Sequence, residues 1–316
     1  MGDTLVERRT AGGPPGAAGR LLSDLLARCA FPAGEPGPLP LAVSGGADSL
    51  ALLVLARSAG LEATAIHVDH GLRSGSAAEA EVVSAAAERY GAGFETRTVR
   101  VDRGPDLEAR ARRARYAALP ADVLTGHTMD DQAETVLLNV LRGAGLDGLA
   151  GMRPAAPGRP RRPLLGVRRA ETEALCRAVG LRPVRDPTND DRRFRRNRIR
   201  AEVLPYLSEV AGRDLVPVLA RQAELIRADG DLLDELSGDI DPTDARSLNA
   251  APVALARRAV RRWLRFAEGA DPEAHPPSAE EVSRVLAVAS GAVRGCELAG
   301  GRRVRRHAGR LSVAAR

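Results

Sequence analysis

The sequence predicts an α/β protein with a doubly wound, mostly parallel sheet and a smaller C-terminal domain that is mainly helical. Between residues 39 and 142, short apolar runs of strand length alternate with stretches of helical length, which is typical of parallel sheets. Polar clusters follow the ends of several of these runs. After about residue 210 the alternation stops. Because such sheets bind ligands outside the carboxyl ends of their strands, we expect the function to lie at that edge.

The elements follow in order along the chain. Residues 1–38 are rich in Gly, Ala and Pro, and their one amphipathic stretch, 20–30, predicts a helix that docks on the sheet behind an N-terminal tail. Strands are expected at 39–43, 63–68, within 94–101 and at 122–126, and helices at 50–59, 76–90, 106–118, 132–142 and 170–179. The Gly- and Pro-rich stretch 143–165 predicts a long mobile loop. We expect a first domain over 39–210 and a helical, arginine-rich second domain over 211–316, whose residues 301–310 fit a strand or a disordered tail equally.

Composition limits the classes of protein. All 47 basic residues are arginine, and a net charge of +6 with a pI near 10.1 suggests a polyanionic partner, although a merely basic enzyme would look the same. The three cysteines are far apart and form no CxxC, which argues against a disulfide framework, a four-cysteine zinc site and a CxxC-held iron–sulfur cluster. No run is long and apolar enough to span a bilayer and no signal peptide is evident, so we expect a cytoplasmic protein without a membrane partner.

The first polar cluster is the turn Ser44-Gly-Gly-Ala-Asp-Ser49, which stands between an apolar strand and an apolar helix. Gly45 and Gly46 allow the backbone to approach an anion closely, and the free N–H groups of a helix start favour negative charge. A carboxylate beside phosphates, here Asp48, implies a bridging divalent cation, Mg²⁺. The turn lacks the Gly-Lys-Ser/Thr end of a Walker A motif and the GxGxxG spacing of a dinucleotide fold. An ordinary loop is the alternative.

A second cluster, Gly126-His-Thr-Met-Asp-Asp-Gln-Ala-Glu134, follows the fourth expected strand. One of the two adjacent acids, Asp130 and Asp131, could simply cap the helix. Two acids with a histidine at the functional edge exceed what a cap needs, and we favour binding of a metal or of a substrate amine. His127 could equally be a structural histidine.

Three arginine-rich segments complete the candidates. Arg112 and Arg115 share one face of an expected helix, and six arginines fall within the nine residues 192–200, with an aromatic ring and an amide among them. Arg257, Arg261 and Arg265 recur at helical spacing. A solvated, ion-paired surface explains such runs as readily as phosphate or nucleic-acid binding does.

Several segments match one known family in order: SGGADS at 44–49, HVDHGLR at 67–73, LEARARRARY at 107–116, GHTMDDQAET at 126–135 with the following LRGAGLDGL, RPLLGV at 162–167 and DPTNDDRRFRRNRIR at 186–200. They resemble the PP-loop enzymes that split ATP to AMP and pyrophosphate, and within them the tRNA(Ile)-lysidine synthases. The first and fourth segments are shared with 2-thiocytidine synthases, and the last is the most specific. Together they span most of residues 39–205.

The resemblance implies a ligase that uses ATP and Mg²⁺. ATP adenylates the C2 oxygen of the wobble cytidine in the CAU anticodon of tRNA(Ile), and the ε-amine of free L-lysine then displaces AMP to give lysidine, which changes codon reading from AUG to AUA. A homodimer is compatible with the resemblance, and the sequence leaves the oligomeric state open.

The resemblance also implies roles for individual residues. Catalysis would depend on Asp48, Asp131, Glu134 and Arg112, with Mg²⁺ held by Asp48 and Asp131. The nucleotide would contact Ser44, Gly45, Gly46, Asp48, Ser49, His67, Arg115, Gly126 and His127. The substrates would contact Arg73, Asp130, Asp131, Glu134, Asn197, Arg198 and Arg200, and the tRNA would contact Arg192, Arg193, Arg195, Arg257, Arg261 and Arg265. Asp131 and Glu134 are the candidates for taking the proton from lysine, whose reference pKa is about 10.4.

Alternatives come from other classes. A thiolating PP-loop enzyme would need the CxxC that this chain lacks, and a small-molecule adenylating ligase would not need its basic tail. A non-catalytic RNA-binding protein would explain the charge but not the acids beside the phosphate loop. Because the chain contains no lysine, a mechanism through a covalent lysyl adenylate on the protein is excluded.

Overall fold

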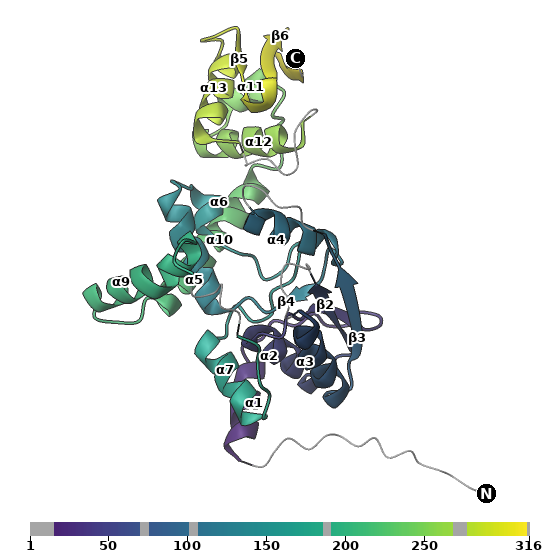
Figure 1. Cartoon of the computed structure of the whole chain (residues 1–316). Helices are drawn as coiled ribbons and strands as arrows, with labels where there is room; N and C mark the ends of the chain where they lie inside the picture. The colour runs from purple at the N-terminus through teal and green to yellow at the C-terminus, as the bar shows by residue number, and fades with distance from the viewer. Residues whose placement is uncertain (1–15, 70–75, 101–106, 186–190, 268–276, 315–316) are drawn as a thin grey trace, which may run out of the picture. The chain divides into compact units, whose positions relative to one another are not determined.

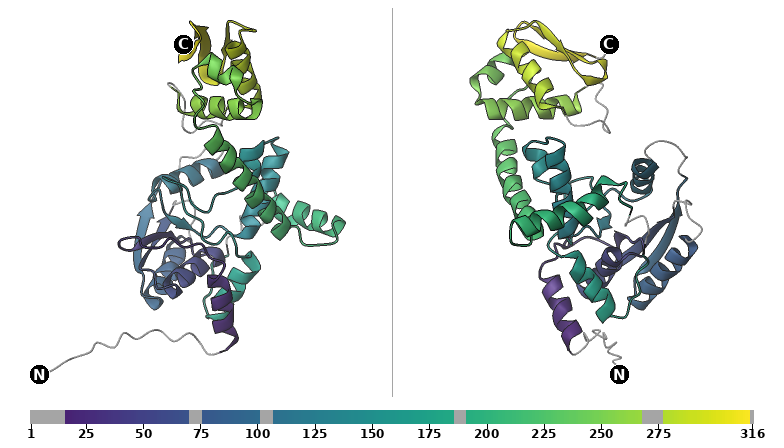
Figure 2. Two further views of the ribbon diagram at one scale, coloured as in Figure 1. Left: turned by 180° about the vertical axis from the view of Figure 1, so that it is seen from behind. Right: turned by 60° about the vertical axis from the view of Figure 1, so that its left-hand side comes forward.

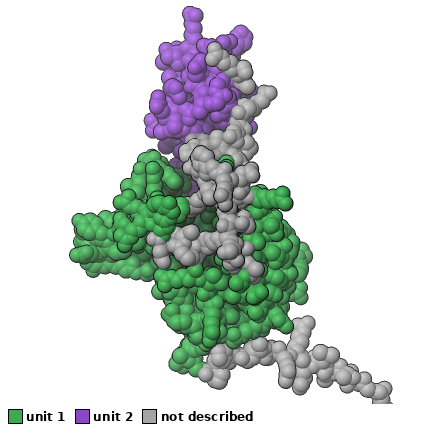
Figure 3. Space-filling model, in the orientation of Figure 1, with its two compact units in different colours: residues 1–223 green, residues 224–316 purple. Residues whose placement is uncertain are grey.

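The computed structural model describes residues 16–69, 76–100, 107–185, 191–267 and 277–314. It divides into two compact units, residues 1–223 and 224–316, which Figure 3 colours separately. The division falls inside the long helix α10 (Val216–Leu236). The expected domain boundary after residue 210 stays a prediction, and each unit is described by itself below.

A four-stranded parallel sheet forms the centre of the first unit. Its strands are β1 (Leu39–Ala42), β2 (Ala63–Asp69), β3 (Gly93–Thr98) and β4 (Leu124–Thr125), in the order β3-β2-β1-β4. Every pair in this sheet is parallel, which confirms the predicted α/β class. The order reverses at β1, so the carboxyl ends of β1 and β4 flank the point where doubly wound sheets bind ligands.

Helices connect these strands in the predicted alternation. They are α2 (Ala47–Ser58), α3 (Ser76–Arg89) and α4 (Leu107–Ala117), and α2 and α3 lie together against one face of the sheet (Figure 1). The side chains of Leu39 and Leu41 on β1 and of Ala63 and Ala65 on β2 enter the main core with α2. Because side chains along a strand alternate between the two faces of the sheet, His67 of β2 lies on the same face as Ala63 and Ala65.

Two helices begin earlier than expected, and this matters for the site. Helix α2 begins at Ala47 instead of residue 50, and α5 (Met129–Leu141) begins at Met129 instead of residue 132. The residues before them, Gly46 and Thr128, are extended N-caps. The acids after each strand thus stand in the first turn of a helix, where the helix dipole favours negative charge.

The stretch 143–165, for which the composition predicts a long mobile loop, is not a continuous loop in the structure, and its mobility stays a prediction. It contains the short helix α6 (Leu146–Leu149), and Gln132 holds Met152 through two hydrogen bonds, of 2.7 Å to its N–H and 3.0 Å to its carbonyl oxygen. The backbone of Arg161 forms an isolated parallel β-bridge with Leu124 of β4. Glycines and prolines mark turns, but they do not reveal such tertiary hydrogen bonds.

The remaining helices of the first unit bring further chain segments to the sheet edge. Helix α1 (Ala17–Leu26) packs against α7 (Arg169–Ala178) and α2, as Figure 2 shows from two sides. Helix α8 (Arg195–Arg198) continues through a π-helical turn, Ile199–Val203, into α9 (Leu204–Val210). Buried Ile199 and Leu204 join α5 through Ala133, so this arginine-rich segment lies against α5.

The second unit is a small α+β core. Helices α11 (Ala245–Ala250), α12 (Val253–Phe266) and α13 (Ala279–Ser290) pack with an antiparallel sheet of β5 (Gly295–Glu297), β6 (Arg303–His307) and β7 (Arg310–Ala314). Residues 303–307 and 310 therefore belong to strands, which decides between the two alternatives for 301–310. Among the described residues, no helix is long and apolar enough to cross a membrane.

Candidate active site

Gly126 brings the ends of β1 and β4 into direct contact. A Cβ atom on Gly126 would lie 2.7 Å from the carbonyl oxygen of Asp48 and 3.0 Å from the backbone nitrogen of Ser49. Real side chains never approach backbone this closely, so only glycine fits here. The two predicted polar clusters therefore meet at the switch point of the sheet, as their positions after parallel strands predict.

The Ser44–Ser49 turn is held by its own hydroxyls. The Ser44 N–H donates to Ser49 Oγ over 3.1 Å, and Ser49 Oγ donates to the carbonyl oxygen of Gly46 over 2.8 Å. Gly45 has φ +84°, a conformation that favours glycine. The N-cap residue Gly46 has no capping side chain, so the first N–H groups of α2 remain available for an anion.

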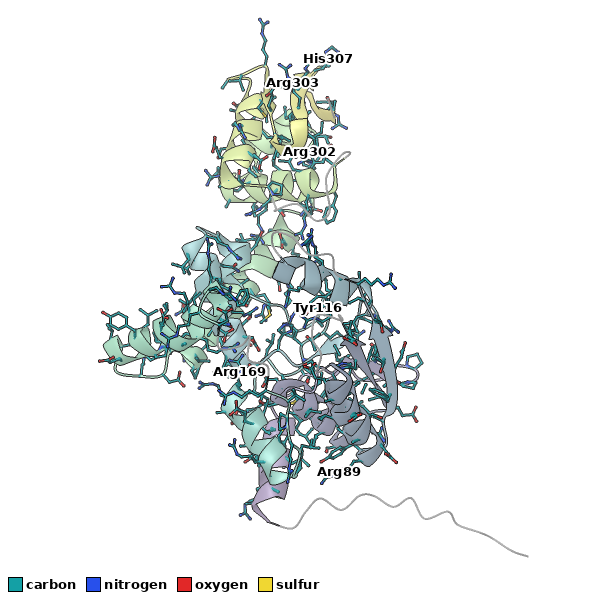
Figure 4. All side chains as sticks on the ribbon, in the orientation of Figure 1. Arg89, Tyr116, Arg169, Arg302, Arg303 and His307 are labelled. Carbon is teal, nitrogen blue, oxygen red and sulfur yellow. The ribbon has the colours of Figure 1, made fainter. Side chains whose placement is uncertain are left out.

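Three carboxylates converge on one guanidinium at this edge. The Arg169 side chain, at the N-terminal end of α7 (Figure 4), donates from Nε to Asp48 Oδ2 over 3.3 Å, from Nη2 to Asp131 Oδ1 over 2.9 Å and from Nη1 to Glu134 Oε1 over 3.1 Å. The exposed fractions of these acidic side chains fall from 25% for Asp48 to 13% for Asp131 and 0% for Glu134. A substrate therefore meets Asp48 and Asp131 before Glu134.

Glu134 is held by two further arginines. Arg196 Nε donates to Glu134 Oε2 over 2.8 Å, and Arg200 donates to both of its oxygens over 2.7 and 3.2 Å. These arginines are four residues apart and share a helical face, and the π-helical turn begins between them, a feature common at functional sites. A buried carboxylate needs such partners to remain ionised.

Asp131 also caps the start of α5, the role that the sequence left open as an alternative. Its Oδ2 accepts from the Thr128 N–H over 2.9 Å and from Thr128 Oγ1 over 3.0 Å, while its Oδ1 faces Arg169. Neighbouring Asp130 accepts from the Arg169 N–H over 2.8 Å and from the Arg168 guanidinium over 3.2 Å, and so fixes the start of α7. The two acids thus have different partners.

The two acids next to Arg169 have opposite pKa shifts. Burial raises the pKa of Asp48 to about 6, although Arg169 and Thr172 oppose this. Asp131 is buried too, but Arg169, His127 and Arg196 together with the Thr128 N–H lower its pKa to about 2. Burial alone would lower the pKa of Arg169, but the three carboxylates raise it by more, so the net shift of this pKa is upward. Asp131 is therefore ionised at all ordinary pH values, whereas Asp48 titrates near pH 6.

Two histidines lie in the same region. Burial lowers the pKa of His127 to about 3, and its Nδ1 lies 2.8 Å from Thr125 Oγ1, which itself donates to the Arg161 carbonyl. His127 is thus the donor of that hydrogen bond. The Nδ1 of His67 lies 3.1 Å from the Val43 carbonyl, and its buried Nε2 has no hydrogen-bond partner among the described residues. Nε2 of His67 is therefore placed to form a hydrogen bond with a bound molecule.

A family model described as a PP-loop domain matches residues 27–207. The tRNA(Ile)-lysidine synthase of Mycolicibacterium paratuberculosis is 47% identical over 262 residues, which cover 79% of this chain and 81% of that protein. That of Nocardia farcinica is 48% identical over 248 residues, covering 72% and 77%. The chain belongs to the tRNA(Ile)-lysidine synthase family.

A solved structure supports the fold. The U34-tRNA thiolase NcsA from Methanococcus maripaludis matches with a TM-score of 0.52 and 18% identity, covering 66% of this chain and 78% of that one. The likeness shows a shared PP-loop fold and nothing about the reaction. The family resemblance predicted from the motifs is thus confirmed by the curated relatives.

The Mg²⁺ that the sequence predicts fits the residues at the switch point. Asp48 Oδ2 and Asp131 Oδ1 are hard oxygen donors that already share one cationic partner, which shows that both can face a single positive charge. No group of three or more potential metal ligands occurs among the residues that the structure describes.

Other predicted site residues are placed differently. Arg112 is exposed with its guanidinium 5.0 Å from the centre of the Tyr116 ring, and Arg115 is half-buried on the same helix. Arg73 lies outside the described residues. Asn197 donates to the Asp191 carbonyl and Arg198 pairs with Glu202, both within the segment 191–202, whereas Arg200 donates to Glu134 of the carboxylate cluster.

The predicted tRNA-binding arginines lie on both units. Arg193 pairs with Asp191 and Arg192 with Glu202, whereas Arg195 is exposed at the start of α8. On α12, Arg257 and Arg265 are exposed and Arg261 is half-buried. Their contact with tRNA stays a prediction.

Sequence reasoning missed three residues of the cluster: Arg169, Thr172 and Arg196. Thr172 donates from Oγ1 to Asp48 Oδ1, and it is completely buried. Arg169 and Thr172 both belong to the first turn of α7, directly after the recognised RPLLGV segment. The position next to that segment was the one signal in the sequence for a role of Arg169 and Thr172 in the site. Two adjacent arginines at the start of a helix are otherwise typical of any basic surface.

Proposed function

We propose that this chain ligates free L-lysine to C2 of the wobble cytidine in CAU-anticodon tRNA(Ile), with ATP cleaved to AMP and pyrophosphate. The observation that carries the proposal is the meeting of the Ser44–Ser49 turn with the Asp131 cluster at one sheet edge, in a chain whose curated relatives are tRNA(Ile)-lysidine synthases.

In the first step the cytidine C2 oxygen attacks the α-phosphorus of ATP, and the bond to pyrophosphate breaks. The N–H groups at the start of α2 and the hydroxyls of Ser44 and Ser49 would bind the phosphates. Asp48 and Asp131 would hold Mg²⁺, which neutralises the charge on the leaving pyrophosphate. The buried Nε2 of His67, which has no hydrogen-bond partner among the described residues, would form a hydrogen bond with the nucleotide base.

In the second step the ε-nitrogen of lysine attacks C2, AMP leaves with the former C2 oxygen, and one amine proton is lost. Asp131 is the better of the two predicted carboxylates for meeting this amine, because Glu134 is fully buried and holds three guanidinium groups. A carboxylate with a pKa of about 2 is a weak base, so Asp131 would orient the amine more effectively than it would deprotonate it.

The test is direct. An unmodified CAU-anticodon tRNA(Ile) transcript is incubated with the protein, ATP, Mg²⁺ and radiolabelled lysine, and the label is located by nuclease digestion. We expect labelled wobble cytidine, and no label on a transcript with uridine at that position. Absence of label with demonstrably folded protein would refute the proposal. A homodimer stays a prediction that sedimentation would test.

A further inference from the structure

Arg169 is positioned as a cation within the site, and no recognised motif assigns it a role. Its side chain is 20% exposed, and each of its three guanidinium nitrogens contacts a different carboxylate. Two of those carboxylates, Asp48 and Asp131, come from the first turns of different helices and would otherwise face each other with like charge. Arg169 therefore neutralises the point at which these two helix starts meet.

The remaining carboxylate oxygens are already engaged. Asp48 Oδ1 accepts the Thr172 hydroxyl, and Asp131 Oδ2 accepts both the N–H and the hydroxyl of Thr128. The oxygens left to bridge a cation between the two acids are Asp48 Oδ2 and Asp131 Oδ1, which are the two that Arg169 contacts. A metal ion on these oxygens and the guanidinium in its present position exclude each other.

We infer that Arg169 is a built-in counter-ion that takes the place of the divalent cation between Asp48 and Asp131 and is displaced when the metal enters with the nucleotide. The inference deepens the proposed function, on which its nucleotide-bound stage rests. Arg169 would keep the starts of α2 and α5 together between turnovers and make tight metal binding depend on the phosphates that arrive with the metal.

Displacement is feasible because Glu134 does not depend on Arg169 alone. Arg196 and Arg200 together engage both Glu134 oxygens, so the buried carboxylate remains paired when Arg169 leaves its position. With Arg169 in place, three guanidiniums face the three carboxylates of Asp48, Asp131 and Glu134. Removal of the Arg169 charge leaves this cluster with excess negative charge, which attracts a cation.

The experiment measures binding of Mn²⁺ alone to the nucleotide-free full chain by electron paramagnetic resonance. Arg169→Gln removes the internal cation, and we expect it to lower the Kd for Mn²⁺ by on the order of tenfold relative to the unchanged chain. Arg169→Lys keeps the charge and should bind Mn²⁺ about as weakly as the unchanged chain. An unchanged or higher Kd in Arg169→Gln, or a Kd in Arg169→Lys as low as in Arg169→Gln, would overturn the inference.

Arg28→Gln is the matched control, because Arg28 pairs with Glu171 on the same helix, outside the cluster. It should leave Mn²⁺ affinity unchanged, and an equal gain there would attribute the effect to loosening of α7 and overturn the inference. If Arg169→Gln does not fold, the Nε–H NMR signal of Arg169 in the unchanged chain decides: it should shift when Mg²⁺ and a non-hydrolysable ATP analogue are added together, and a constant signal overturns the inference. Neither readout uses tRNA or lysine, so failure of lysine transfer alone would refute only the proposed function.

Discussion

Asp48 and Asp131 carry the same charge, contact the same guanidinium and should nonetheless have opposite effects on stability. Burial raises the pKa of Asp48 to about 6, so the folded chain holds this proton more tightly than the unfolded chain, whose Asp48 titrates at its ordinary value of 3.8. Stability therefore falls as pH rises from about 4 to about 6 and stays at the lower level above that. At about 1.4 kcal/mol per pH unit, ionised Asp48 costs about 3 kcal/mol at neutral pH.

For Asp131 the sign is reversed. Its partners lower the pKa from 3.8 to about 2, so its ionised form stabilises the fold by about 2 kcal/mol above pH 4, and this stabilisation is lost as pH falls toward 2. We expect Asp48→Asn to raise the free energy of unfolding at pH 7.5 by up to about 3 kcal/mol, and Asp131→Asn to lower it by about 2 kcal/mol.

Urea unfolding followed by circular dichroism, with a chelator present, measures both effects. At pH 4 the gain from Asp48→Asn should have largely vanished, because Asp48 is then protonated in the folded chain. Mg²⁺ added with a non-hydrolysable ATP analogue should stabilise the unchanged chain and not Asp48→Asn. Stability changes of the same sign in the two variants, or a gain in Asp48→Asn that is independent of pH, would contradict the reasoning from burial.

Three further outcomes follow from the contacts. Glu134→Gln leaves three guanidiniums without their buried anion and should cost about 3 kcal/mol in urea unfolding; a loss below 1 kcal/mol would contradict the ion-pair network. Gly126→Ala forces a methyl group against the Asp48 carbonyl, and calorimetry should show weaker binding of an ATP analogue, whereas unchanged affinity would place the nucleotide elsewhere. Arg257 is exposed on α12, and Arg257→Ala should weaken tRNA binding and reduce the slope of the logarithm of the binding constant against the logarithm of salt concentration by about 1. Arg258→Ala removes the ion pair with Asp234 and should mainly lower stability. The reverse result would exclude the Arg257 face of α12 from tRNA binding.

The parts that sequence predicts well are those fixed by local pattern. Strand–turn–helix spacing placed Asp48 and Asp131 after parallel strands, and parallel strands present their carboxyl ends at one edge, so their meeting follows from topology. Arg169 could not be found in this way. It reaches the cluster because α7 packs on α2 through buried Leu175 and Cys176, a tertiary contact that no local pattern encodes. The contacts of the stretch 143–165 could not be predicted for the same reason, since Gln132 binds Met152 across 20 residues.

The absence of lysine has a chemical consequence for a site of this kind. The proposed reaction makes an activated cytidine that an amine attacks, and a neutral ε-amine of the protein close to the site would compete with free lysine. All 47 basic side chains are arginine, and three of them pair with Glu134, which lies beside the Asp131 that would meet the substrate amine. A guanidinium stays protonated at any ordinary pH and does not act as a nucleophile. The cluster can therefore be neutralised by cations that pair with the acids and still leave free lysine as the reacting amine.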